Sequence, residues 1–176
     1  TQDGLVATYI TEEGGQTKAK FVLEDGPAEM NFSNGVIAGY PVEEMYLNGT
    51  DLQKEVYFTI PSVQTYVENT FADKAMPMIS DVANDRNLKF NNAAGVIRFM
   101  ISAPEEITVQ SVVVNSDSEY ISGECIYIPE SKIYAFDEST VSEHSVELSC
   151  GEGVTVNEEQ KAFHIVVPHQ DYTGLN

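Results

Sequence analysis

The chain has 176 residues, of which 42% are hydrophobic and 21% are charged. This composition is typical of a globular protein and excludes wholesale disorder. Its 28 acidic and 9 basic residues give a formal net charge of −19, and such a surface repels nucleic-acid backbones and anionic lipid head groups. We therefore expect no nucleic-acid partner. No run reaches the roughly 18 apolar residues that a membrane span needs.

The first sixty residues predict short strands separated by turns. Residues 5–10, 19–23 and 36–40 are weak strand candidates, and residues 55–60 (EVYFTI) are a strong one. In the strong segment apolar residues alternate with Glu55 and Thr59, and this period of two is typical of a half-buried antiparallel strand. We expect its inward side chains to be Val56, Phe58 and Ile60.

Residues 61–87 are the least regular part of the sequence and predict a long connection, with one helical turn near Val67-Glu68. The run that follows, LKFNNAAGVIRFMI (88–101), is too short for a helix between its Asn pair and Pro104, so it predicts a strand. Because it has apolar residues on both faces, we expect a central or covered strand. Arg98 then pairs with an acidic residue on a neighbouring strand.

Further strands follow in hairpin fashion at residues 107–114, 120–128, 132–136, 144–150 and 162–167. Alternation changes phase near Gln110-Ser111, which predicts a β-bulge. The segment GEGVTV (151–156) follows a strand and no helix follows it, so we interpret it as a hairpin turn. Many short strands with regular turns predict an all-β fold, an antiparallel Greek-key β-sandwich formed by residues 1–176 as a single domain.

The only cysteines are Cys125 and Cys150. Each lies on the apolar face of a predicted strand, so the two could form a disulfide or remain buried free thiols. No Cys-x-x-Cys pair or closely spaced His pair indicates a zinc site.

A search for chemistry assigns no catalytic, cofactor-binding or metal-binding residue. The histidines are His144, His164 and His169. The sequence has no Gly-x-Ser-x-Gly motif that would supply a serine nucleophile for a catalytic triad with one of them. Adjacent carboxylates lie in turn-like or strand-end contexts typical of solvated loops (Glu12-Glu13, Glu43-Glu44, Glu105-Glu106 and Glu158-Glu159). Acidic residues around position 80 lack the spacing of a calcium loop (Asp73, Asp81 and Asp85). We expect a protein that is not an enzyme.

Several motifs occur in a fixed order: IP-x-x-Q-x-Y, PM, F-x-N-x-x-G, G-E-G-V and F-x-I-V-V-P. Together they resemble the fimbrillin-like, type V pilin-like surface lipoproteins of Gram-negative gut and oral anaerobes. The residues that carry this resemblance are Ile60, Pro61, Gln64, Tyr66, Pro77, Met78, Phe90, Asn92, Gly95, Gly151, Glu152, Gly153, Val154, Phe163, Ile165, Val166, Val167 and Pro168. They span about two thirds of the chain, whereas residues 1–50 add nothing.

The resemblance implies a subunit of two β-sandwich domains, of which this chain is the N-terminal one. It implies a shaft, anchor or tip subunit of a fimbria, or a surface adhesin, at the outer membrane or outside the cell. The expected partners are other fimbrial subunits, joined by β-strand addition, and host or bacterial surface ligands. Membrane contact is expected only through a lipid anchor; no lipid-bearing Cys begins the sequence, so we expect that anchor to have been removed.

Two features separate this chain from the family that it resembles. Many of them have Cys at the position of Ala94, whereas this chain has Cys125 instead. In the family the Gly174-Leu175 step opens another strand, so we expect a C-terminal portion to be missing and a sheet edge to be left unpaired.

The alternative function is a surface glycan-binding sandwich module, which a row of exposed aromatic rings would favour. A deep pocket with facing carboxylates would instead favour a hydrolase.

Overall fold

The computed structural model describes residues 8–14, 19–26, 31–41, 45–47, 55–85, 87–129, 131, 133–136, 142–172 and 174–176. Nearly all regular structure in these ranges is β. In chain order the elements are β1 (Thr8–Gly14), β2 (Ala19–Asp25), η1 (Phe32–Asn34), β3 (Gly39–Tyr40), β4 (Met45–Leu47), β5 (Val56–Ile60), β6 (Val63–Thr65), β7 (Met78–Ser80), β8 (Phe90–Asn92), β9 (Ala94–Ile101), β10 (Ile107–Asn115), β11 (Ser122–Ile128), β12 (Ile133–Phe136), β13 (Ser142–Glu143), β14 (Ser145–Val156) and β15 (Lys161–Pro168). The predicted all-β class is confirmed.

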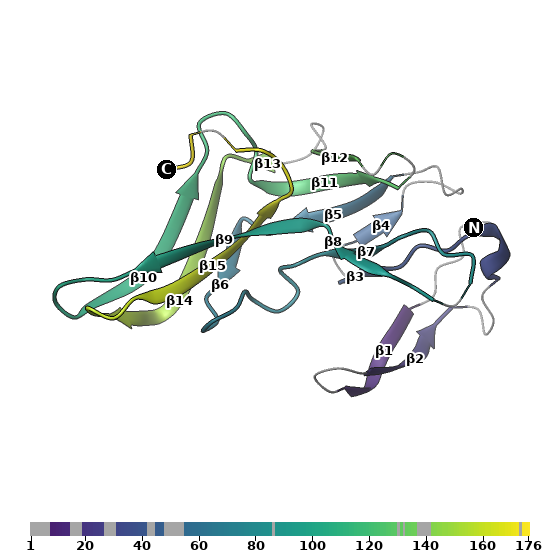
Figure 1. Ribbon diagram of the computed structural model, residues 1–176, viewed down its shortest axis with the longest axis horizontal. Coiled ribbons are helices and arrows are strands. Elements are labelled where there is room, and N and C mark those ends of the chain that lie inside the picture. Colours follow the sequence, from purple (N-terminus) through teal and green to yellow (C-terminus); the bar gives the residue numbers. More distant parts are fainter. Residues whose placement is uncertain are drawn as a thin grey trace.

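Apart from the β1-β2 hairpin, which lies away from the other strands in Figure 1, the strands form small sheets that pack as a sandwich. One sheet has the order β10-β14-β6 and another the order β12-β11-β5-β4, while β15-β9, β3-β7-β8 and β1-β2 form smaller units. Pairing is antiparallel except between β14 and β6, which run parallel. Strands far apart in sequence, such as β5 and β11, are neighbours, so the chain crosses between sheets as Greek-key sandwiches do.

Strand β15 lies at the centre of the packing, because its two faces contact different apolar clusters. Phe163, Ile165 and Val167 point into one cluster, and Val166 points into the other. All four are almost fully buried. A strand covered on both faces carries a continuous apolar run, which explains why AFHIVV shows no simple alternation.

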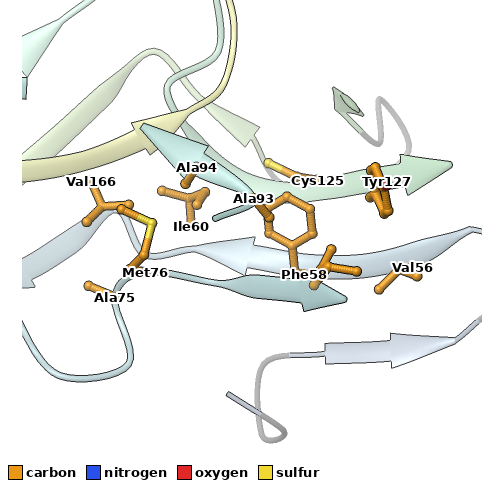
Figure 2. Close-up of a cluster of buried hydrophobic side chains, with 11 residues drawn as sticks. Val56, Phe58, Ile60, Ala75, Met76, Ala93, Ala94, Cys125, Tyr127 and Val166 are labelled. Atoms are coloured by element: carbon orange, nitrogen blue, oxygen red, sulfur yellow. The ribbon is translucent and has the colours of Figure 1, made fainter. Parts of the chain in front are cut away.

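The first cluster lies between β5 and β11 on one side and β7 and the start of β9 on the other (Figure 2). The predicted inward residues of β5, namely Val56, Phe58 and Ile60, are all buried there. The second cluster joins β14 and β10 to β15 and β9. Its buried members include Val146, Leu148 and Cys150, so the alternation predicted for residues 144–150 is confirmed.

The prediction that residues 94–101 form a covered strand is wrong. β9 pairs with β15 along one edge only, and its outer face leaves Val96 40% and Met100 43% exposed. The partner of Arg98 across the ladder is His164 rather than an acidic residue, which also corrects the expected ion pair. Apolar residues on both faces therefore do not distinguish an edge strand such as β9 from a strand covered on both faces, because the sequence pattern does not show which face receives a neighbour.

The GEG segment is not a hairpin turn, as predicted, but an irregularity inside the long strand β14. Opposite it, β10 passes from Val109 to Ser111, while β14 passes from Val154 to Ser149. The extra residues therefore bulge out of β14, with Gly151 at φ 59° and Gly153 at φ 111°. Only glycine adopts such angles readily. The predicted break in the ladder at Gln110-Ser111 is confirmed, and its cause is the β14 bulge.

The connection at residues 61–87 is irregular as predicted, but it contains two short strands, β6 and β7. The helical turn expected near Val67-Glu68 is wrong. An isolated bridge joins Val67 to Thr70, and Asn69 between them has φ 62°, so the chain makes a tight turn there. The only helix in the described ranges is η1, whose first turn is capped by the side chain of Asn31.

The two cysteines are buried and free, so of the two alternatives the free thiols are correct. They lie in different clusters, Cys125 in the first and Cys150 in the second. Burial raises the pKa of the Cys125 thiol to about 12, with a smaller contribution from the neighbouring Glu124 carboxylate. Burial also raises the pKa of Cys150. Both act as small apolar side chains.

Candidate functional site: an open sandwich edge

The candidate site is the edge of β10 that faces away from β14. In the described part of the chain no strand pairs along this edge between Ile107 and Val114. Pairing begins only at its C-terminal end, where Leu175 forms an antiparallel bridge with Ser116. There Asn115 and Asn176 exchange two backbone hydrogen bonds, each 2.9 Å long. Figure 1 shows the C-terminus beside this end of β10.

Apolar side chains lie directly behind the open edge. Val114 is only 3% exposed, and Val112 and Val109 are half-buried against the second cluster. An unpaired row of N–H and C=O groups beside such side chains is a template for another strand. The outer face of the same strand exposes Val113 and Ile107.

β9 also has one unpaired edge among the described residues, whereas the edges of β14 and β15 that face away from β10 and β9 are covered. Closure comes from β6, which pairs with β14 and sends the side chain of Gln64 to β15. The amide of Gln64 donates to the carbonyl oxygen of Val166 at 2.7 Å and accepts from its N–H at 2.9 Å. At Val166 this side chain thus takes the place of a neighbouring strand. β10 and β9 lie at the far ends of these two sheets and have no such cap among the described residues.

Hydrogen bonds hold the segment after β15 in place. The Tyr172 hydroxyl donates to the carbonyl oxygen of Pro168 at 2.6 Å, and Gln170 donates to that of Tyr120 at 2.7 Å. The Asn176 side chain donates to Asp117 at 2.9 Å. Burial raises the pKa of Tyr172 well above its usual range, so its hydroxyl remains a donor. These bonds direct the last residues to the end of β10.

The three histidines lie apart and in different settings. His144 stacks on Tyr120, with ring centroids 4.5 Å apart, and its Nδ1 donates to the Glu119 carbonyl oxygen at 2.8 Å. His164 has a buried Nδ1 without a hydrogen-bond partner, and His169 lies against Tyr134. None of these contacts joins a histidine to a serine or cysteine nucleophile.

The acidic residues weighed for calcium do not come together. Asp81 and Asp85 line an open hollow of about 500 Å³, but Asp73 accepts a hydrogen bond from the Tyr40 hydroxyl. Asp85 instead holds the local turn through Asn87, which lowers the pKa of its carboxyl. Across the ranges that the structure describes, no group of three or more His, Cys, Asp or Glu side chains could hold a metal ion.

The adjacent carboxylates are scattered over the chain. Glu105-Glu106 and Glu158-Glu159 are exposed in two neighbouring turns, which a hydrogen bond from the Ala103 N–H to the Asn157 carbonyl oxygen joins. Glu43-Glu44 lies outside the described residues, and of Glu12-Glu13 only the backbone, in β1, is described. The hollow that Asp81 and Asp85 line includes none of these pairs.

Four of the residues that carry the family resemblance, Gln64, Tyr66, Phe163 and Val166, meet where β6 lies against β15. Gln64 binds the backbone of Val166, and Tyr66 packs against Phe163 with ring centroids 5.1 Å apart. Burial raises the pKa of Tyr66. These four residues therefore have a structural role, because their contacts join two sheets. The residues that sequence reasoning missed are those of the β10 edge, since alternation alone does not distinguish an edge strand from an internal one.

The described fold defines the class of protein as an all-β sandwich, and the edge of β10 is among its unpaired sheet edges. Scans of the sequence against protein-family models, curated proteins and solved structures gave no match. Among the described residues, no helix is long and apolar enough to cross a membrane.

Proposed function

We propose that this chain is a structural or adhesive subunit of a cell-surface fimbria and joins its partners by β-strand addition. The observation that carries the proposal is the unpaired β10 edge beside buried apolar side chains, where Leu175 and Asn176 already begin an antiparallel ladder. In strand addition, main-chain hydrogen bonds supply affinity and alternate side chains supply specificity. The expected partners are other fimbrial subunits, and the expected location is the cell surface.

Charge supports a joint made by backbone and apolar groups. At a formal net charge of −19, like subunits repel one another at long range. A joint that depended on surface ion pairs would also weaken in salt. Hydrogen bonds of a strand ladder and contacts with Val112 and Val114 are little affected by ionic strength, so the joint should persist in 1 M salt.

The proposal is tested in cells that produce the protein at their surface. Immunogold electron microscopy should show the chain in filaments. Val113→Pro should remove it from them, because this change deletes an N–H on the open edge without touching the bonds to β14. The matched control is Glu158→Pro, in the exposed turn before β15. Filaments that incorporate the Val113→Pro chain as well as the control would refute strand addition at β10.

A second candidate, surface glycan binding, rests on the ring pair of Tyr120 and His144. Both are exposed and stack with an interplanar angle of 23°, and Gln170 lies alongside through its bond to Tyr120. Flat ring surfaces with neighbouring amides suit the apolar faces and hydroxyls of sugars. Glycan-array binding that is lost in Tyr120→Ala and kept in Tyr46→Ala would favour this function.

A further inference from the structure

The pairing of Asn115 with Asn176 fixes the direction and register in which β10 can be extended. Because the bridge between Ser116 and Leu175 is antiparallel, a strand that continues it runs from the end of β10 towards its beginning. The residue after the Asn115 position is then opposite Val114, and the following ones are opposite Val113, Val112 and Ser111. This order follows from one residue facing one residue in a regular ladder.

Alternation of backbone groups identifies which positions bond to the incoming strand. Asn115 turns its N–H and C=O to the open edge, where both bond Asn176. Ser116 turns the other way, since its N–H donates to His144 on the β14 side. The same alternation turns the N–H and C=O of Val113 and Ser111 to the open edge, and those of Val114 and Val112 to β14.

The side chains of β10 alternate between the inner and the outer face of the sheet. Val114 is 3% exposed and Val112 is half-buried, so both point inward, whereas Val113 is 48% exposed and Ser111 is exposed. Residues directly opposite in an antiparallel pair share a face. Beyond Ser111 the β14 bulge interrupts the regular ladder, so the regular part of the site extends from Asn115 to Ser111.

We propose that the partner at this edge is an extended segment of another polypeptide, antiparallel to β10, with apolar side chains opposite Val114 and Val112. Opposite Val113 and Ser111 the segment has N–H groups that donate hydrogen bonds to β10, and its side chains there face outward. Proline is therefore excluded at those two positions and tolerated opposite Val112. This inference rests on the proposed strand addition and defines the chemistry of the strand that is added.

Extending the chain itself tests the register, because a segment appended after Asn176 enters the ladder at a known position. The sequence Val-Thr-Val-Thr places valine opposite Val114 and Val112, and Thr-Val-Thr-Val has the same composition shifted by one residue. The first extension should raise Tm by about 3–6 °C over the unextended chain, and the second should raise it by less than half as much. Proline as the second appended residue should abolish the gain, while proline as the third should keep most of it.

Equal gains from the two extensions, or equal losses from the two prolines, would overturn the inferred register. Free peptides of both patterns, titrated while NMR follows the β10 amides, separate this failure from that of strand addition. Binding of both peptides with equal affinity would leave strand addition standing and refute the inferred partner chemistry. Binding of neither, with no gain from either extension, would refute both. Preferential binding of the Val-Thr-Val-Thr peptide supports both.

Discussion

Gln64 offers the sharpest test of how the two sheets are held together. Its side chain is 3% exposed and bonds both backbone groups of Val166, a residue that is itself fully buried. It also donates to the Pro61 carbonyl oxygen at 3.3 Å. Gln64→Ala removes these bonds and leaves the N–H and C=O of Val166 without partners at the edge of β15.

The expected cost follows from the two groups left unsatisfied. Each buried donor or acceptor without a partner costs about 1–3 kcal/mol, so Gln64→Ala should lower the free energy of unfolding by about 2–6 kcal/mol. Domains of ordinary stability have about 5–15 kcal/mol in total. The substitution should therefore remove a large share of the stability. Gln160→Ala is the control because that glutamine is exposed in the turn before β15, and it should cost less than about 0.5 kcal/mol.

Gln64→Glu adds a pH test with a defined sign. A protonated carboxyl can donate to the Val166 carbonyl and accept from its N–H, as the amide does, but an ionised one faces that carbonyl without a proton. The folded-state pKa of the new carboxyl is therefore raised above its unfolded value of about 4.3. The folded state holds the extra proton, so stability is greatest below about pH 4.3 and is lost as pH rises through the folded pKa.

Urea titration of wild type, Gln64→Ala and Gln64→Glu between pH 4 and 8 measures both effects. Amide exchange of Val166 gives a local readout, because this N–H should lose protection in Gln64→Ala more than that of Ile165, which faces β9. A cost below about 1 kcal/mol for Gln64→Ala, with unchanged Val166 exchange, would refute the idea that this side chain replaces a strand. So would a Gln64→Glu variant whose stability relative to wild type does not change with pH.

Three further predictions concern the core, the bulge and the thiols. Phe163→Ala should cost about 3–5 kcal/mol in urea titrations, whereas Val113→Ala on the exposed face should cost under about 0.5 kcal/mol; similar costs would contradict the assigned faces. Gly153 has φ 111°, and a Cβ added there would lie against Thr108, whereas Gly151 has φ 59° and open space around it. Gly153→Ala should therefore lower the urea midpoint more than Gly151→Ala does. The reverse order would contradict the assigned bulge. Burial raises the pKa of Cys125 from 9.0 to about 12, so as pH rises the unfolded chain loses this proton before the folded protein does. The free energy of unfolding should therefore fall between these pH values. Cys125→Ala should make Tm less sensitive to pH in that range, and an unchanged dependence of Tm on pH would contradict the prediction.

The sequence predicts the faces of strands well where one face is apolar and the other polar. Val146, Leu148 and Cys150 are inward as their alternation indicates. The prediction fails for β9, which looks like a covered strand and is an edge strand. Alternation reports the chemistry of each face of a strand but not which neighbour arrives there, and the number of neighbours depends on contacts between residues far apart in sequence.

The glycine pair of β14 shows a second limit. Gly-x-Gly after a strand has the same local signature whether the chain reverses or bulges, because both need positive φ. What decides between them is the partner strand. β10 pairs with β14 on both sides of the glycines, at Val109 and again at Ser111, so the chain continues instead of turning back. The phase change in β10 was the visible part of this arrangement in the sequence.

The sequence predicted that the candidate site is an unpaired sheet edge, but it did not predict which strand forms that edge. The expectation of an unpaired edge came from the family resemblance, and a count of strands cannot say which edge it is. The difference between the two sides of the sandwich rests on β6, which pairs with β14 and carries Gln64. Gln64 meets the backbone of β15 at Val166, so that side is occupied by this chain's own amide. At β10 the corresponding groups of Val113 and Ser111 lack a partner among the described residues, and only Asn115 is satisfied, by Asn176. An edge strand without protective charge or proline is a hazard unless a partner covers it, so the absence of both from Ile107–Val114 is consistent with an edge that is built to be covered.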